Sequence, residues 1–385
     1  MNVQADAAAR EVVSEFAIDG ELLTLERFER GHIHDTFISR FRMGSGAEQR
    51  FLHQRVNHRV FRDVPALMNN IECITSHLAS HYGDPDVDSH MHALELVPTR
   101  AGRSFVEAST GPWRTYVFIE GTRSLDRCEG PEQAFLAARA FGQFQADLAG
   151  LDVSQLRMTI PNFFSSPYRM RQLDEAVAKG DPDRVAGAQA ELSFVAARRD
   201  MVDVIEAAMR IGRFPRRVVH GDTKLNNVLF CDQAGHAICV VDLDTCMPGY
   251  SLYDFGDLVR FTAAKSKEDE TDLHQVGTDF ELYKALVDGY LASASSFLSD
   301  DEIRLMPFAA RLVTYTIGLR FLADHLNGDV YFKVGREGHN LDRARVQFAM
   351  VASMEQQGDA MESYVRSQSK RGIVTGNGRL AASDS

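Results

Sequence analysis

The most constraining feature of the sequence is one segment that joins short apolar runs to a dense set of polar residues. Residues 218–230 read VVHGDTKLNNVLF, and after a turn the apolar run 237–241 ends at Asp242. Apolar runs separated by a turn that contains glycine predict a hairpin. Folding this hairpin about its turn places Asn227 close to Asp242. Asp222, Asn227 and Asp242 are therefore expected to converge at the open end of the hairpin.

Two carboxylates and an amide oxygen at one place suit phosphoryl transfer, in which the protein mainly positions groups and stabilises charge. Asp222 would orient the attacking hydroxyl. Asn227 and Asp242 would hold Mg²⁺, which prefers oxygen ligands and bridges nucleotide phosphates. The D-x-x-x-x-N spacing, followed by a hairpin and an aspartate, matches the layout of kinase catalytic loops. Lys224 would balance charge on the transferred phosphoryl group, and His220 is interpreted as a packed histidine that braces the loop.

A second acidic triplet, Asp254-Phe255-Gly256, spells the metal-binding triplet of protein kinases. It lies too far from the hairpin, and Ser251 ahead of an apolar run predicts a helix-capping box instead. We therefore assign the metal to Asp242, and we expect Asp254 to cap a helix and brace the catalytic loop. For Asp244 two interpretations stay open, namely support of the metal site or plain surface charge.

The N-terminal part of the chain is rich in strand patterns and contains one clear helix pattern. Strands are predicted over residues 36–42, 50–56, 94–100 and 114–119, and an amphipathic helix over 64–78. Asp63 is the expected N-cap of that helix, with Pro65 in its first turn. These patterns favour a mixed α+β lobe.

Three residues of this lobe are predicted to bind nucleotide. Gly31 lies in the segment that opens the first hairpin and runs to Thr36, and a glycine there lets backbone amides approach phosphates. Arg55 ends the next strand, where kinase-like lobes place a cation that pairs nucleotide phosphates. A surface arginine is the alternative, and Glu72 is a weaker candidate as its anchor.

The rest of the chain is mainly helical. Helices are predicted over residues 133–148, 184–209, 279–291, 301–325 and 341–366, with strands only within 216–244. We expect a nucleotide-binding lobe over 1–119, a catalytic and acceptor-binding lobe over 120–366, and a mobile tail over 367–385.

Composition narrows the function classes. The 385 residues carry 42 Lys+Arg against 54 Asp+Glu, a net charge of −12, which disfavours a nucleic-acid binder because phosphate contacts need a basic surface. No apolar run is long enough to span a membrane, and no signal peptide is evident. The five cysteines form no CxxC pair, so we expect reduced thiols and a cytoplasmic protein.

Beyond these patterns, HGD, the following Asn and VVDLD resemble the aminoglycoside-phosphotransferase-like kinase superfamily. The blocks GHIHDTF, FLHQRVNHRVFRD with LMNNI, WRTYVFIE, VVDLDTCMPGYSLYDFGDLVR, RFLADHLNGDVYFKV and HNLDRAR resemble N-acetylhexosamine 1-kinases within it. This resemblance implies a bilobal, protein-kinase-like α+β fold and an ATP- and Mg²⁺-dependent kinase acting on the anomeric hydroxyl of N-acetylglucosamine or N-acetylgalactosamine. It also implies that Asp222 acts as the base-like residue and contacts the sugar, together with Arg320 and Tyr331. For these last two residues a helix-surface arginine and a packed tyrosine are the alternative.

Three positions depart from the family pattern: Glu29 replaces a glycine, His34 an asparagine and Asn69 a glutamate. Because of these differences, the loop that contains Glu29 and His34 need not contact the nucleotide phosphates as it does in the family. A lysine–glutamate pair of the family type is likewise not expected to be complete. Two alternatives to the hexosamine kinase stay open. One is a related kinase with another acceptor, such as N-acetylmuramate, another hexose, an aminoglycoside or an amino alcohol. The other is a nucleotide-binding regulatory module, which the complete acidic set disfavours. We expect a monomer or weak homodimer.

Overall fold

The computed structural model describes residues 9–28, 33–84 and 91–376. By its contacts the chain divides into two compact units, and each is discontinuous in sequence. The first unit comprises Met1–Ser124, Gly150–Pro161 and Val228–Pro248, and the second comprises Leu125–Ala149, Asn162–Asn227 and Gly249–Ser385. The boundary expected near residue 120 lies close to the first crossing between them. The return of residues 228–248 to the first unit had no signal in the sequence, and the division into functional lobes stays a prediction.

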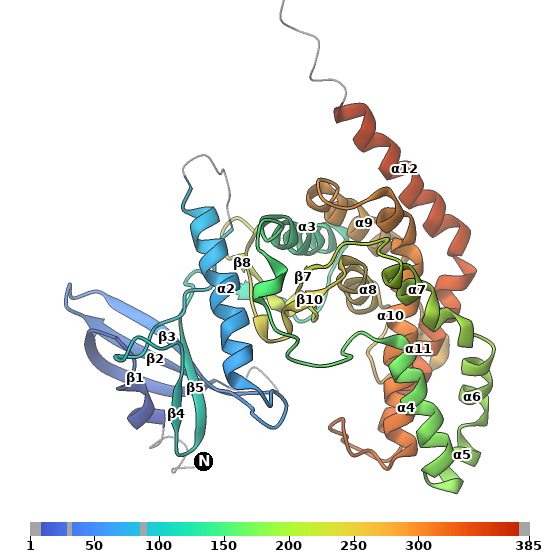
Figure 1. The fold of residues 1–385 in the computed structure, drawn as a ribbon, viewed down its shortest axis with the longest axis horizontal. Helices are drawn as coiled ribbons and strands as arrows, with labels where there is room; N and C mark the ends of the chain where they lie inside the picture. The colour runs from blue at the N-terminus through green and yellow to red at the C-terminus, as the bar shows by residue number, and fades with distance from the viewer. Residues whose placement is uncertain (1–8, 29–32, 85–90, 377–385) are drawn as a thin grey trace, which may run out of the picture. The chain divides into compact units, whose positions relative to one another are not determined.

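The first unit is built on a five-stranded antiparallel sheet in the order β1-β2-β3-β5-β4 (Figure 1). Its strands are β1 (Gly20–Phe28), β2 (Asp35–Met43), β3 (Glu48–Arg55), β4 (Val106–Ala108) and β5 (Gly111–Val117). The predicted hairpin is confirmed as β2 and β3, with Phe37 opposite His53. The prediction of a strand over residues 94–100 is wrong, because this segment makes only isolated β-bridges, at Leu96 and Thr99. Pro98 lacks the N–H that a regular ladder needs.

Helix α2 (Val64–Tyr82) also belongs to this unit, and its cap is as predicted: Asp63 accepts a hydrogen bond from the Ala66 amide. A second antiparallel sheet contains β6 (Thr122–Ser124), β8 (Val228–Cys231) and β9 (Ala237–Val240). The pairing of Val228 with Val240 confirms the hairpin predicted around the acidic residues.

The second unit is mainly helical. Its helices are α3 (Pro131–Asp147), α4 (Ser166–Lys179), α5 (Pro182–Gly187), α6 (Gln189–Ala196), α7 (Asp203–Arg210), α8 (Ser251–Thr262), α9 (Phe280–Ala294), α10 (Asp300–Leu326), α11 (His339–Gln356) and α12 (Gly358–Gly376). The short strand β7 (Arg217–Val219) leads to the loop that carries Asp222. Strand β10 (Met247–Gly249) begins in the first unit, ends in the second and precedes α8.

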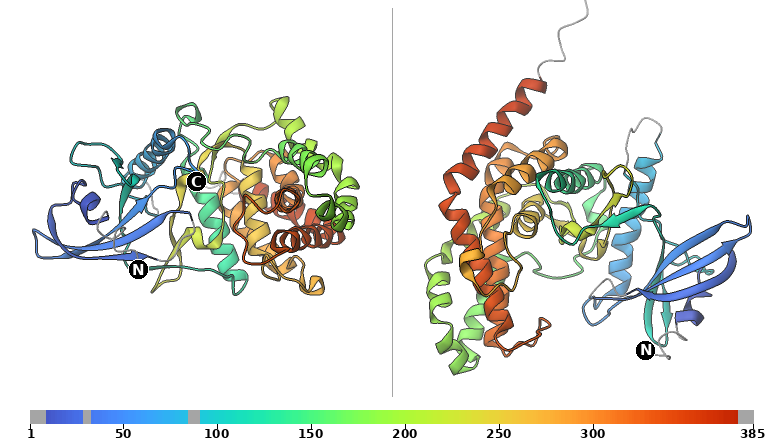
Figure 2. Two further views of the ribbon diagram at one scale, coloured as in Figure 1. Left: turned by 90° about the horizontal axis from the view of Figure 1, so that it is seen from below. Right: turned by 180° about the vertical axis from the view of Figure 1, so that it is seen from behind.

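Two predicted helices are broken in the structure. The helix expected over 184–209 is divided into α5, α6 and α7, and the one over 341–366 breaks at Gln357 into α11 and α12. Helix α12 continues to Gly376, so the first part of the expected tail is helical, and the residues after it lie outside the described part of the chain. Figure 2 shows α12 running beside α10, which α4, α8 and α11 also contact. No helix in the described part of the chain is long and apolar enough to cross a bilayer.

Candidate active site

The loop after β7 is held from behind by a buried histidine, as predicted. The His220 ring is inaccessible to solvent and makes edge contacts with Phe141 and Phe144, at centroid distances of 5.3 and 5.8 Å. Its Nδ1 accepts a hydrogen bond from the Asp222 amide at 3.2 Å. The imidazole therefore fixes the backbone of the residue that the sequence identifies as the reactive carboxylate.

Asp254, on α8, braces the same loop. One carboxylate oxygen accepts from the His220 amide at 2.7 Å and the other from the Gly221 amide at 2.9 Å, while the Gln145 side chain also donates to it. Burial raises the pKa of Asp254, and these donors act in the opposite direction. The bracing role is confirmed. The capping role is wrong, because α8 begins at Ser251 with no side-chain cap.

A second aspartate of α8, which sequence reasoning missed, also supports the loop. Asp257 accepts from the Thr223 amide at 3.2 Å and from Arg260 Nε at 3.0 Å. Its pKa is raised by burial, lowered by Arg260 and raised again by the nearby charge of Asp222. Its position three residues after Asp254, on the same helix face, was the available signal.

Asp222 contacts two of the other residues that the motif singles out, Lys224 and Asn227. Lys224 Nζ lies 2.7 Å from Asp222 Oδ2. Asn227 Nδ2 donates to the Asp222 carbonyl at 2.8 Å and to Oδ2 at 3.3 Å. Since the amide nitrogen of Asn227 is used in this way, its amide oxygen is the atom that can serve a cation. The Asp222 side chain is only 18% exposed, so the carboxylate is held in a defined position.

Asp242 lies in the first unit, directly before a short 3₁₀ turn (Leu243–Thr245). Its backbone has φ 62° and ψ 58°, the left-handed conformation. Non-glycine residues rarely adopt it, and such outliers are concentrated at functional sites. Asn162 and Asp329 share it, and asparagine and aspartate adopt it more readily than most residues, so it sets the backbone direction into the turn without assigning Asp242 a role.

Asp244, two residues on, is buried and therefore not a surface charge. It accepts two hydrogen bonds from Arg114, one of them at 2.8 Å, and lies 2.5 Å from His34 Nε2. Because the Asn57 amide donates to His34 Nδ1 at 3.0 Å, Nε2 carries the ring proton and donates to Asp244. Burial alone would raise the pKa of Asp244, but Arg114 and His34 hold it below its usual value.

The expected nucleotide-binding residues are only partly described. Gly31 lies outside the described residues. Thr36 is buried in β2, opposite Gln54 of β3. Arg55 Nε donates to Asp35 at 2.9 Å and Nη1 to the Thr110 carbonyl at 3.4 Å. Among the described residues the anchor of this cation is therefore Asp35, in place of the expected Glu72. The nucleotide role of all three residues stays a prediction.

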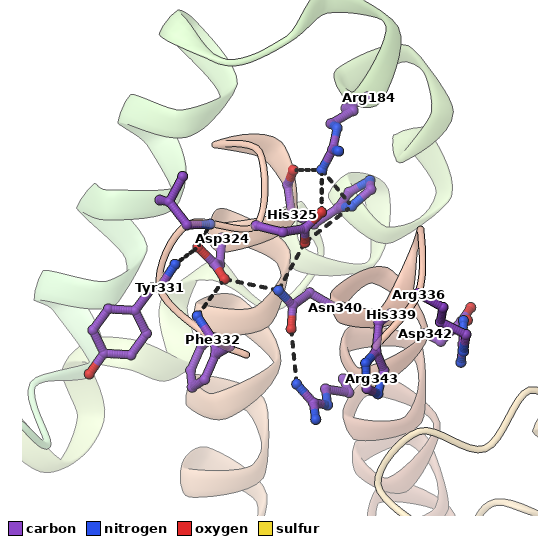
Figure 3. Close-up of polar contacts among 12 residues, drawn as sticks. Arg184, Asp324, His325, Tyr331, Phe332, Arg336, His339, Asn340, Asp342 and Arg343 are labelled. Atoms are coloured by element: carbon purple, nitrogen blue, oxygen red, sulfur yellow. Dashed lines mark hydrogen bonds and ion pairs between the residues drawn. The ribbon is translucent and has the colours of Figure 1, made fainter. Parts of the chain in front are cut away.

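Arg320 and Tyr331 lie together in the second unit. The Arg320 guanidinium is 5.8 Å from the Tyr331 ring centroid, and both line a cavity of about 140 Å³. Asp324 fixes the loop that carries the tyrosine, because it accepts hydrogen bonds from the amides of residues 330–332 (Figure 3). The Tyr331 ring points away from this carboxylate and is 70% exposed.

Each of the two residues expected to hold magnesium carries a suitable donor. Asn227, in the second unit, offers an amide oxygen, and Asp242, in the first unit, offers a carboxylate; both are hard ligands of the kind Mg²⁺ uses. Within the described ranges no group of three or more His, Cys, Asp or Glu side chains is arranged to hold a metal. Magnesium bound between nucleotide phosphates and waters does not need one, because one or two protein oxygens suffice.

Comparison with known families agrees with this geometry. The model of the phosphotransferase enzyme family APH matches residues 43–289, nearly two thirds of the chain. The chain belongs to this family. The match includes Asp222, Asn227 and Asp242, whereas Arg320 and Tyr331 lie beyond it.

Solved structures show that this phosphotransferase has the fold of aminoglycoside phosphotransferase-like kinases. An aminoglycoside phosphotransferase from Alicyclobacillus acidocaldarius is 16% identical, with a TM-score of 0.58 over 94% of this chain and 96% of that chain. A microcompartment-associated aminopropanol kinase is 16% identical, with 0.55 over 92% and 98%. A choline kinase from Cryptosporidium parvum is 13% identical, with 0.53 over 89% and 92%.

Proposed function

We propose that this phosphotransferase transfers the γ-phosphoryl group of ATP, with Mg²⁺, to the anomeric hydroxyl of an N-acetylhexosamine, N-acetylglucosamine or N-acetylgalactosamine, giving the sugar 1-phosphate. The observation that carries the chemistry is the loop in which Asp222 is held between Lys224 and Asn227. The blocks around Arg320 and Tyr331 support the sugar acceptor.

In this proposal Asp222 receives the hydroxyl proton and aims the oxygen lone pair at the γ-phosphorus. Lys224 stays bound to Asp222 in the free enzyme and can turn to the transferred phosphoryl oxygens. Asn227 and Asp242 are the proposed magnesium ligands, and the metal would neutralise charge on the phosphates. Gly31, Thr36 and Arg55 are proposed to contact the nucleotide.

The acceptor side has an electrostatic connection to the catalytic loop. Burial lowers the pKa of Arg320, while Tyr331 and, more weakly, the charge of Asp257 act in the opposite direction; Asp257 also accepts a hydrogen bond from the Thr223 amide. Arg320 can donate a fork of hydrogen bonds to ring hydroxyls, and Tyr331 offers an apolar face with a polar tip. Two arginines in the cavity disfavour a cationic acceptor such as an aminoglycoside. The absence of disulfides among the five cysteines, all in described ranges, supports a reducing, cytoplasmic compartment.

The test is ATP- and Mg²⁺-dependent turnover of N-acetylglucosamine, N-acetylgalactosamine, glucose, N-acetylmuramate and kanamycin, with phosphorus NMR of the product. We expect an anomeric phosphate on an N-acetylhexosamine. Asp222→Asn should lower kcat by about 10²- to 10⁴-fold, the usual contribution of a positioned acid–base group, with an unchanged melting temperature. Near-normal turnover by this variant, or turnover of kanamycin alone, would contradict the proposal.

A further inference from the structure

The cavity beside Arg320 contains a second arginine that neither the motifs nor the family match point to. Arg169 lies on α4 and Arg320 on α10, and both line the same space of about 140 Å³. Gln172, Asp324 and Tyr331 are also among its walls. This volume is large enough for several water molecules, so it can accept a small charged group together with part of the molecule that carries it.

Neither arginine has a carboxylate partner. Arg169 donates to Gln172 Oε1 at 2.8 Å and to the Phe163 carbonyl at 3.3 Å, while its Nε is buried without a hydrogen-bond partner. The Arg320 guanidinium lies among aromatic rings, 5.2 Å from the Phe332 centroid and 5.9 Å from that of Phe163. Within the described part of the chain, neither of these half-buried side chains forms an ion pair, whereas the buried Arg114 and Arg260 both do.

The carboxylate of Asp324, the one acidic side chain among the residues that line the cavity, already accepts four hydrogen bonds. Asp324 Oδ1 accepts from the amides of Val330 and Tyr331 at 3.0 and 2.8 Å, and Oδ2 accepts from the Phe332 amide and from Asn340 Nδ2, both at 2.9 Å (Figure 3). These four donors hold the loop in place. Asp324 therefore stabilises the cavity wall and does not neutralise the arginines.

The two guanidinium groups also repel each other. Burial lowers the pKa of Arg169 to about 10, and the charge of Arg320 adds to the shift. Asp257, the acidic neighbour that acts on Arg320, is already paired with Arg260. A chain of net charge −12 thus contains a local site with excess positive charge. Buried charges are normally paired, and an arginine fork binds carboxylate and phosphate with charge-assisted hydrogen bonds.

We propose that the cavity between α4 and α10 is an anion-binding subsite in which Arg169 and Arg320 hold a carboxylate or phosphate group. The anion has two sources, an acidic substituent of the acceptor or a separate small anion. We favour the substituent. This narrows the proposed acceptor class, because among N-acetylhexosamines an acidic one such as N-acetylmuramate would then be preferred to the neutral sugars. This link to the acceptor rests on the proposed function, whereas binding of the anion itself does not.

Arg169→Met is the decisive variant, because it removes the charge and keeps much of the side-chain volume. Arg171→Met is the matched control, since Arg171 is an exposed arginine on the same helix. Arg169→Lys retains the charge without the planar fork. The readouts are calorimetric binding of inorganic phosphate and of N-acetylmuramate, and the KM values for N-acetylmuramate, N-acetylglucosamine and ATP.

We expect Arg169→Met to weaken binding of N-acetylmuramate and raise its KM by about ten- to a hundredfold, the loss of one hydrogen bond to a charged group. The KM values for N-acetylglucosamine and ATP should change less than about twofold. Arg169→Lys should recover part of the loss, and Arg171→Met should behave as wild type. If inorganic phosphate binds in an Arg169-dependent manner but acidic sugars are not preferred, the subsite stands with a separate anion as its ligand.

The proposal is overturned if neither phosphate nor the acidic sugar binds in an Arg169-dependent manner, or if Arg169→Met affects neutral and acidic sugars equally. The proposed function fails separately, when no sugar is phosphorylated although phosphate still binds through Arg169. Should Arg169→Met not fold, phosphate binding to the wild type and to Arg169→Lys decides the matter.

Discussion

Asp244 shows at the scale of single residues how this protein keeps a charge in its interior. A buried carboxylate is costly in free energy unless donors surround it. Here Arg114 supplies two N–H groups and His34 a third. Arg114 is itself held by Gln54, which accepts from Nε at 3.0 Å. The network fixes the short turn that follows Asp242.

Removing Arg114 should therefore be costly. We expect Arg114→Met to lower the free energy of unfolding by about 3–5 kcal/mol, because it leaves an unpaired carboxylate in the interior. Urea unfolding measures this. The control is Arg40→Met, whose partner Glu48 is half exposed, and which should cost less than about 1 kcal/mol. Equal costs for the two variants would show that Asp244 gains little from its pair.

Sequence reasoning succeeded at this scale where the signal was local. Asp222, Lys224 and Asn227 lie within six positions, so their spacing predicted that they lie close together, whereas the direct contacts of Asp222 with Lys224 and Asn227 were not predicted. The Arg114–Asp244 pair joins residues 130 positions apart, and no pattern in one sequence links them. Because its partner Arg114 is so distant in the sequence, Asp244 could not be assigned either to support of the metal site or to the surface.

At the scale of elements, helices with a strong apolar period were predicted well and irregular segments were not. Helices α3, α9 and α10 begin and end within a few residues of the expected bounds. The segment 184–209 has helical composition, yet it breaks into short pieces, since contacts with α10 and α11 select local turns. Tertiary contacts override propensity in such cases.

Gly256, the last residue of the Asp254-Phe255-Gly256 triplet, allows α8 to pack closely against α10. A Cβ atom on Gly256 would lie 2.6 Å from the Ala309 carbonyl oxygen of α10, which is backbone and cannot move aside. We expect Gly256→Ala to destabilise the protein by about 1–3 kcal/mol through overpacking. Gly187→Ala, at a helical glycine with open space around it, should be neutral or stabilising. Thermal unfolding of both variants is the measurement, and a neutral Gly256→Ala would contradict the close contact.

At the scale of the whole molecule, the phosphotransferase family and the hairpin after Asn227 could be predicted, but the discontinuous units could not. Residues 228–248 follow the catalytic loop directly, yet their contacts are with residues of the N-terminal sheet and α2, such as Arg114 and Asn70. Such long-range contacts leave no periodic trace in a sequence. Acceptor identity is equally hidden, because a single contact in a pocket can decide it.

Ligand linkage gives a test at this scale. A ligand that binds only the folded state stabilises it by RT ln(1 + [L]/Kd), about 2.7 kcal/mol at a hundredfold excess over Kd. MgATP should therefore raise the melting temperature, and chelation of Mg²⁺ with EDTA should remove most of the rise. Asp242→Asn should lose the magnesium-dependent part, and Asp232→Asn, in the hairpin turn, should keep it. An EDTA-insensitive rise would exclude Asp242 as a metal ligand.

The two aspartates of α8 also determine how the catalytic loop exchanges its amide hydrogens with solvent. The amides of His220, Gly221 and Thr223 all donate to carboxylates of this one buried helix. Loop amides usually exchange quickly through small local fluctuations. Here exchange requires α8 to separate from the loop, and α8 is itself packed against α10. These three positions should exchange as slowly as the helical core, so the reactive loop opens only when the core around it does.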